Sequence, residues 1–279
     1  MAASSQPQTT VIEPGRIHPW RELQKLANYR DLLSFLVRRD VSVRYKQTAI
    51  GALWALLQPL LLAGVFTVFL GVLVKVPSER GVPYSLFALS GMVMWLFFSG
   101  AMTSSSESTI KDKELISKTY FPRILIPISA VLPYVIDFGI GFAVVLVFAM
   151  VTGHLPGVAL LLLPVLVVLA LSTALGLGMW LSALNVKYRD VHHVVPFIVL
   201  VGMFITPVTY PFHLIPVDLR PLYALNPMVG VIEGFRWMLF SEVSWPGAVM
   251  AIPVATSVVL LVSGFLYFQR AERDFADVI

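Results

Sequence analysis

Five long runs of apolar residues constrain what this chain can fold into more than any other feature. A helix needs about 20 predominantly apolar residues to cross the hydrocarbon core of a bilayer. Each run reaches that length, and the runs cover about residues 49–74, 83–105, 123–151, 158–184 and 246–268. The sequence therefore predicts an all-α integral membrane protein.

The composition agrees with a membrane protein rather than with a large soluble domain. The chain has 279 residues, of which 57% are hydrophobic and 13% charged, and its mean hydropathy is +0.82. Typical globular domains are about 45–50% apolar and about 25% charged. The net charge of +4 would suit a nucleic-acid-binding protein, but basic residues beside membrane spans explain it better. Because the chain has no cysteine, it forms no disulfide and no thiolate metal site.

A sixth span is expected at about 191–210, although this segment is less regular. It has 20 residues and no acidic or basic residue apart from His192 and His193, but it contains two prolines. Prolines in membrane helices usually produce kinks that neighbouring helices accommodate. We therefore expect Pro59 and Pro207 to kink their helices rather than to end them.

Inside the spans, two pairs of small residues and one acidic residue stand out. Ser172 and Gly176 lie four positions apart, as do Ala174 and Gly178, and this spacing lets helices approach closely. Asp137 is the one acid clearly deep within a span. An intramembrane acid is a candidate functional group, but without a visible basic partner it would equally serve as a neutral or hydrogen-bonded group between helices.

The segment from Leu222 to Phe240 is apolar enough to raise the question of a seventh crossing. Its eight Leu, Ile, Val and Phe residues favour insertion by about −2 to −5 kcal/mol, whereas Glu233 and Arg236 each cost about +2.5 to +3.5 kcal/mol at mid-depth. Because the two contributions roughly cancel, a full crossing is not favoured in free energy. We therefore predict an amphipathic helix or a pair of re-entrant helices on the outer face, within 212–240. Glu233 and Arg236 lie three residues apart and would pair there.

The distribution of basic residues predicts the orientation. With six spans and a cytoplasmic N-terminus, sixteen of the twenty Lys and Arg residues lie on the cytoplasmic side. Cytoplasmic loops carry such an excess, and a seventh crossing would move Arg270 and Arg273 outside. We therefore predict six spans within 48–268, a disordered cytoplasmic tail at 1–19 and a second cytoplasmic tail at 269–279.

Residues 20–47 are predicted to form an amphipathic helix on the inner membrane surface. Apolar residues recur at the spacing of one helical face, and the basic residues lie mainly opposite. This pattern directly before a span suits the membrane–water interface, although packing on a partner would give the same pattern. The apolar positions are Tyr29, Leu32, Leu33, Leu36 and Val37.

Two charged segments are predicted to face the cytoplasm. Residues 106–122 fit a short soluble helix, with a capping box of Ser104 and Glu107 and an i,i+4 pair of Glu107 with Lys111. On the physics of the sequence alone, a solvated connector fits this segment better. Residues 185–193 form a charged loop that helps to fix the topology.

The sequence lacks the motifs of common enzymes. No phosphate-binding G-x-x-x-x-G-K-[ST], zinc-binding H-E-x-x-H or nucleophile-bearing G-x-S-x-G motif occurs. His192 and His193 are adjacent and would point apart on a helix, so we expect no metal site. Enzyme chemistry on this chain is therefore not expected.

Several stretches resemble the membrane subunit of ABC-2-type exporters, specifically the group that exports O-antigens, capsular polysaccharides and teichoic acids. The stretches are RRDVSVRYKQTAIGALWALLQPL (38–60), ISKTYFPRILIP (116–127), NVKYRDVHHVVPF (185–197), TPVTYP (206–211) and LNPMVGVIEGFRWML (225–239). The resemblance implies a homodimer in the bacterial inner (plasma) membrane, bound to two copies of a cytoplasmic ATPase. ATP and Mg²⁺ would bind to that ATPase, and this chain would need no cofactor.

The resemblance also implies roles for individual segments. The helix before residue 47 would be an interface helix, 106–119 the coupling helix that docks in a groove of the ATPase, and 185–193 a second, lesser contact. Residues 212–240 would form short re-entrant helices that shape the channel exit. The expected coupling residues are Glu107, Lys111, Asp112, Lys113, Glu114, Lys187, Arg189 and Asp190, and those of the outer gate are Asn226, Pro227, Glu233, Arg236 and Trp237.

The implied cargo is a long polysaccharide on undecaprenyl pyrophosphate or a similar lipid. Aromatic rings stack on sugars, although interfacial belts and ordinary packing use the same residue types. The candidates for the channel lining are Phe66, Phe69, Trp95, Phe97 and Phe98. A pyrophosphate requires cations at the inner mouth, although attraction to anionic lipid would explain the same charges. The candidate cations are Arg38, Arg39, Arg44 and Lys46.

Two alternatives remain open on the sequence. An ABC-2 exporter subunit for a drug or a small lipid would share this architecture but handle a compact substrate. An ion-coupled carrier or flippase would need no ATPase, and Asp137 would then be its titrating group.

Overall fold

The computed structural model describes residues 27–46, 53–79, 81–154, 156–188, 190–240, 243, 245, 247–273 and 275. The tail expected at 1–19, the first residues of the predicted interface helix and the candidate coupling residue Arg189 lie outside the described residues. Within the described residues the chain is helical and contains no strand, which confirms the all-α prediction.

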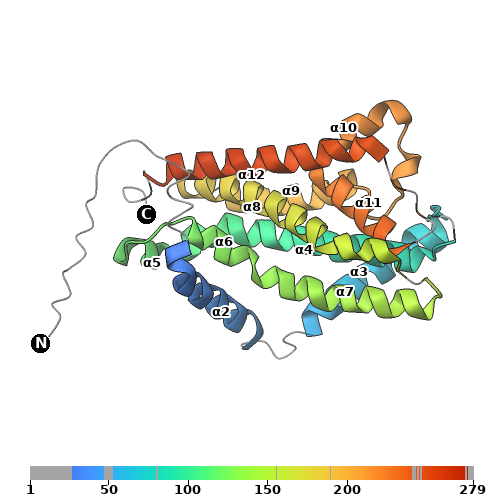
Figure 1. Cartoon of the computed structure of the whole chain (residues 1–279), viewed down its shortest axis with the longest axis horizontal. Coiled ribbons are helices and arrows are strands. Elements are labelled where there is room, and N and C mark those ends of the chain that lie inside the picture. Colours follow the sequence, from blue (N-terminus) through green and yellow to red (C-terminus); the bar gives the residue numbers. More distant parts are fainter. Residues whose placement is uncertain are drawn as a thin grey trace, which may run out of the picture.

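Five helical segments are long and apolar enough to cross a membrane, and they coincide with the five apolar runs. They lie side by side along the long axis of the molecule (Figure 1). In chain order they are α3 (Leu53–Phe66) with the π-helical Thr67–Leu73, α4 (Tyr84–Lys111), α6 (Leu125–Val131) with α7 (Pro133–Val151), η3 (Val158–Leu162) with α8 (Leu163–Lys187), and η6 (Gly247–Met250) with α12 (Ala251–Ala271).

The sixth expected span forms a shorter helix than the sequence predicts. α9 (Val191–Ile205) has 15 residues, or about 22 Å of helix against a hydrocarbon core of about 30 Å. Thr206 after it is extended, with φ −83° and ψ 139°, because a following proline disfavours the α conformation. The prediction that Pro207 only kinks a continuing helix is therefore wrong, whereas Pro59 does lie inside α3. The sixth crossing itself stays a prediction.

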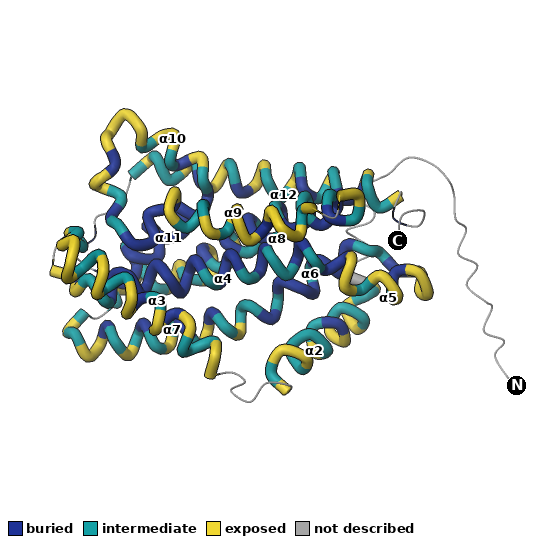
Figure 2. The backbone as a smooth tube through the Cα atoms, turned by 180° about the vertical axis from the view of Figure 1, so that it is seen from behind, coloured by how far each residue is buried: buried dark blue, intermediate teal, exposed yellow. Residues whose placement is uncertain are grey.

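α4 is the central helix of the bundle. It contacts α3, α6, α7, α8 and α11, and its side chains are buried over most of its length. Figure 2 shows α4 and α11 as the buried centre, whereas α2 is mainly a mixture of intermediate and exposed residues and α5 is mostly exposed. A helix that is apolar on all sides belongs in such a position.

α8 is held between α12 and α4 by close backbone contacts. A Cβ atom at Gly176 would lie 2.6 Å from the carbonyl oxygen of Leu260 in α12, and one at Gly178 would lie 2.4 Å from Ser105 in α4. Helices approach this closely only where one side chain is absent. The glycine of each small-residue pair predicted from the sequence therefore lies at a close helix contact, Gly176 against α12 and Gly178 against α4.

The remaining helices lie at the two ends of the bundle (Figure 1). α2 (Arg30–Lys46) and α5 (Lys113–Lys118) lie at the end where α12 finishes. The short α10 (Arg220–Ala224) and α11 (Pro227–Leu239) lie toward the opposite end. Part of the apolar stripe of α2 packs within the chain rather than facing lipid: Leu36 is fully buried against the cluster formed by Ile116, Phe121, Leu125 and Ile126.

Candidate functional site

The segment predicted to couple to an ATPase begins differently from the prediction. α4 runs on to Lys111, so Ser104 and Glu107 lie inside it, and the expected capping box does not form. Serine is tolerated inside this helix where its hydroxyl donates to the preceding turn, as Ser106 does to the carbonyl of Thr103 and Ser108 to that of Ser105, each at 2.7 Å. The separate helix is the six-residue α5, Lys113–Lys118.

The predicted coupling residues divide into paired and exposed groups. Glu107 lies 3.2 Å from Nδ1 of His192 in α9, rather than pairing with Lys111. Asp112 accepts a hydrogen bond from Arg39. The charged residues left on the surface are Lys111, Lys113, Glu114, Lys187 and Asp190, with Glu114 3.2 Å from Lys118.

Arg39 ties α2 to the coupling segment. Its Nη2 donates to Asp112 at 2.7 Å and to Asp40 at 2.9 Å. Burial lowers the pKa of Arg39, but the hydrogen bond and charge of Asp112, together with Asp40, outweigh it and raise the pKa above its ordinary value. Arg39 is thus a charged clamp between two segments and has two carboxylate partners already.

A cavity of about 790 Å³ lies between the C-terminal end of α2 and helices α3, α4 and α7. This volume is in the range of sites that hold small ligands, about 300–1,000 Å³. Most of its wall is apolar. The side chains with polar groups that line it include Arg44, Tyr45, Gln58, Thr103, Tyr134 and Asp137.

Asp137, expected as an acid without a visible partner, has two partners from α2. Its carboxylate forms an ion pair with Arg44 and accepts a hydrogen bond from the hydroxyl of Tyr45. Burial, together with the hydrogen bond to Asp137 and the charge of Asp137, raises the pKa of Tyr45. The hydroxyl of Tyr45 therefore stays protonated and donates a hydrogen bond to the carboxylate. The partners escaped sequence reasoning because 92 positions separate Tyr45 from Asp137.

Gly100 in α4 allows the ring of Tyr134 to lie close to Arg44 and Asp137. A Cβ atom at Gly100 would lie 2.3 Å from the ring of Tyr134, so the ring lies directly against α4 only because Gly100 has no side chain. In that position the centroid of the Tyr134 ring lies 4.0 Å from the guanidinium carbon of Arg44, which is a cation–π contact. Arg44 is therefore held between an aromatic face and a carboxylate.

The other residues proposed for the inner mouth and the channel lie in different surroundings. Arg38 and Lys46 are exposed on α2. Phe66, the last residue of α3, is half-buried, and Phe69 is exposed in the π-helical segment Thr67–Leu73. Trp95, Phe97 and Phe98 are buried in the bundle. Phe97 lines the large cavity, and Trp95 lines a smaller one of about 390 Å³ between α4 and α9. Their role in lining a channel stays a prediction.

At the opposite end, the sequence Asn226-Pro227 starts α11. The Asn226 side chain accepts a hydrogen bond from the backbone N–H of Met228 at 3.0 Å and donates to Thr206 at 2.7 Å. A capping asparagine followed by proline at the first helical position is a favoured helix start. α11 then passes between α4, α8 and α12 and is buried along nearly its whole length, with Trp237 half-buried.

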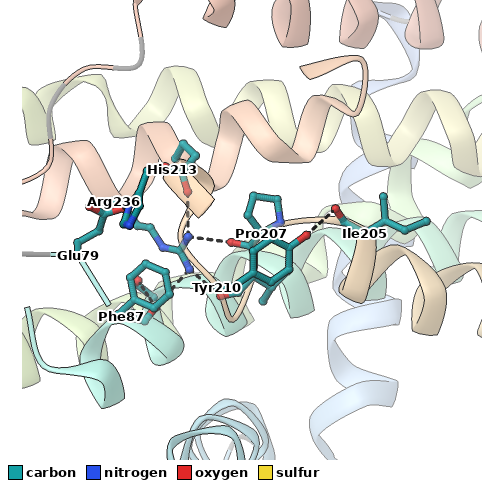
Figure 3. A network of polar contacts seen from close by, with 10 residues as sticks. Glu79, Phe87, Ile205, Pro207, Tyr210, His213 and Arg236 are labelled. Atoms are coloured by element: carbon teal, nitrogen blue, oxygen red, sulfur yellow. Dashed lines mark hydrogen bonds and ion pairs between the residues drawn. The ribbon is translucent and has the colours of Figure 1, made fainter. Parts of the chain in front are cut away.

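Arg236 is fully buried, and both terminal nitrogens of its guanidinium donate hydrogen bonds, whereas its Nε has no hydrogen-bond partner among the described residues (Figure 3). Its Nη1 donates to Glu233 at 2.9 Å and to the carbonyl of Pro207 at 2.8 Å, and its Nη2 donates to the carbonyl of Val208 at 2.6 Å. The ring centroid of Phe87 in α4 lies 3.6 Å from the guanidinium carbon. The predicted pairing of Glu233 with Arg236 is confirmed, and the network ties α11 to the segment after α9.

The chain is similar to known proteins over most of its length. The family described as ABC-2 type transporter matches residues 31–240. The O-antigen export system permease protein RfbA of Myxococcus xanthus is 31% identical over 264 residues, which cover 93% of this chain and 99% of the relative. RfbA of Klebsiella pneumoniae is 28% identical over 250 residues (89% and 95%), and the polysialic acid transport protein KpsM of Escherichia coli is 23% identical over 248 residues (85% and 92%).

Proposed function

Because this chain belongs to the ABC-2 type transporter family, we propose that it is the membrane subunit of an ATP-driven exporter of lipid-linked polysaccharide. The observation that carries the proposal is the 31% identity to an O-antigen export permease over 99% of that relative's length. A partner ATPase would bind ATP and Mg²⁺, and this chain would provide the path through the membrane. Bacterial relatives and five apolar helices support a place in a bacterial inner membrane.

The proposed assembly is a homodimer of six-span subunits with both termini in the cytoplasm. The excess of basic residues on the predicted inner side supports this orientation. α9 would be the sixth crossing, and its large exposed side chains, such as Phe197 and Phe204, would be covered by lipid or by a second copy. The buried position of α11 supports a helix that dips into the membrane and returns.

In the proposed mechanism, closure of the ATPase pushes on α5 and the end of α4. The Arg39–Asp112 clamp passes this movement to α2, because it links the coupling segment to that helix. A path for the polysaccharide then opens at the seam between two copies. The α10–α11 region shapes the exit on the outer side.

Deleting the gene in its native strain tests this function. We expect the lipid-linked polysaccharide to accumulate inside the cell and to disappear from the surface, and a plasmid-borne wild-type gene to restore it. Glycan analysis of cytoplasmic-membrane and surface fractions measures both effects. A deletion strain with normal surface polysaccharide would contradict the proposal, as would accumulation of a small lipid or drug instead of a glycan.

A further inference from the structure

We propose that Asp137 is a selectivity residue for the lipid end of the cargo. Its carboxylate is paired with Arg44. A pyrophosphate head group displaces this carboxylate from Arg44, whereas the phosphodiester head groups of bulk phospholipid do not. This inference rests on the proposed function, because it concerns how the cavity beside α2 would recognise a lipid-linked cargo.

Arg44 is the more exposed partner of its ion pair with Asp137. The Arg44 side chain is 37% exposed, whereas that of Asp137 is 14% exposed. Both side chains line the same cavity, Arg44 from α2 and Asp137 from α7. An anion that binds Arg44 must compete with this internal carboxylate rather than with water alone.

The cavity offers apolar surface directly beside this cation. Trp54 and Pro59 of α3, Phe97 of α4 and Phe138 of α7 line the same space. An amphiphile fits such a site, because its charged end would meet Arg44 while its first apolar units cover the aromatic wall. Arg39 does not take part, since it is bound to Asp40 and Asp112 outside the cavity lining.

Charge decides which anion displaces the carboxylate. A phosphodiester carries a single negative charge, as Asp137 does, so its exchange onto Arg44 gains little attraction. It also leaves Asp137 largely buried with only the Tyr45 hydroxyl as a partner, which is unfavourable. A pyrophosphate carries at least two negative charges and presents several oxygens to the planar guanidinium, so its attraction is strong enough to replace the ion pair.

Such a device is needed because phospholipids vastly outnumber any lipid-linked sugar in a membrane. An unpaired arginine at a lipid-facing cavity would be filled by whichever anionic head group is most abundant. Specificity against a common competitor requires an element that disfavours the competitor as well as one that binds the substrate. Asp137 supplies the disfavouring element, and Arg44 with Tyr134 supplies the binding surface.

The test measures binding to the full-length chain in phosphatidylcholine nanodiscs by isothermal titration. The probes are farnesyl pyrophosphate, phosphatidylglycerol and inorganic pyrophosphate. The wild type is expected to prefer farnesyl pyrophosphate over phosphatidylglycerol. Asp137→Asn is expected to raise the affinity for phosphatidylglycerol about tenfold and so to narrow the preference, since the competing charge is gone. Arg44→Gln is expected to lose binding of both lipids.

Two further variants keep the test decisive. Asp31→Asn removes the same charge from an exposed position on α2 and is expected to match the wild type. Tyr45→Phe leaves the charges unchanged but removes a donor to Asp137, so the carboxylate holds Arg44 more firmly and farnesyl pyrophosphate binds more weakly. Tyr45→Phe therefore gives a second reading if Asp137→Asn does not elute as folded protein.

The inference would be overturned if Asp137→Asn kept the wild-type preference for farnesyl pyrophosphate over phosphatidylglycerol. It would also be overturned if Tyr45→Phe bound farnesyl pyrophosphate with unchanged affinity. Equal affinity for inorganic and farnesyl pyrophosphate would assign the site to a soluble anion and overturn it as well. Export in the deletion strain is a separate readout. If the Asp137→Asn gene restores export in the deletion strain and the purified variant keeps the lipid selectivity of the wild type, only the role of Asp137 is overturned. A deletion strain with normal surface polysaccharide overturns the proposed function.

Discussion

Replacing Arg236 by methionine is expected to lower the free energy of unfolding by about 3–5 kcal/mol, because Glu233 would remain buried without its partner. The carbonyls of Pro207 and Val208 would lose their donor in the same step. The segment after α9 would then no longer be tied to α11. Thermal unfolding of the purified protein in detergent, followed by size-exclusion chromatography, measures the loss.

Two variants separate a buried-charge effect from general damage. Arg270→Met makes the same substitution at an exposed position at the end of α12. It is expected to change the free energy of unfolding by no more than about 0.5 kcal/mol. Replacing Glu233 and Arg236 together by methionine is expected to recover part of the loss, since no unpaired charge remains. An Arg236→Met protein as stable as Arg270→Met would contradict this account of the network.

Charge reversal in the coupling segment is expected to abolish export while ATP hydrolysis continues. Lys111, Lys113 and Glu114 are exposed and would meet the ATPase directly, so Lys111→Glu, Lys113→Glu or Glu114→Lys would place like charges in that contact. We expect export to fall by about tenfold or more, because like charges across a contact cost several kcal/mol. Surface polysaccharide and the ATPase activity of the purified complex measure the two sides of this uncoupling.

The fold around these residues does not depend on them. α5 is anchored through Ile116, which packs with Leu36 of α2 and Leu125 of α6, so the variants are expected to assemble normally. The matched control is Asp218→Lys, a charge reversal at an exposed position in the segment Val217–Leu219 directly before α10. Normal export by a coupling variant whose complex assembles as the wild type does would refute the coupling role.

The spans were predictable from the sequence because length and apolar character are local properties. The five runs became the five long helices, and the spacing of Gly176 and Gly178 indicated true helix contacts. The capping box at Ser104 was wrong because its pattern is equally compatible with a helix interior, where serine hydroxyls bond to the preceding turn. The end of α9 at Ile205 follows from Pro207, because a proline disfavours the α conformation of the residue before it, here Thr206.

Polar partners were predictable only where they are close in the chain. Glu233 and Arg236 lie three positions apart on one helix, so their pairing followed from helical geometry. Arg39 and Asp112 are 73 positions apart, and Arg44 pairs with an acid on a different helix. Such pairs are fixed by how α2 packs against α6 and α7, and no local pattern carries that information.

The most direct test of the central claim is transport by purified components in proteoliposomes. This chain, its partner ATPase and the lipid-linked polysaccharide are combined, and the amount of glycan that becomes accessible across the bilayer is measured with and without ATP. We predict transport only when both proteins and hydrolysable ATP are present. Transport by this chain alone, or transport that persists without ATP hydrolysis, would contradict the account.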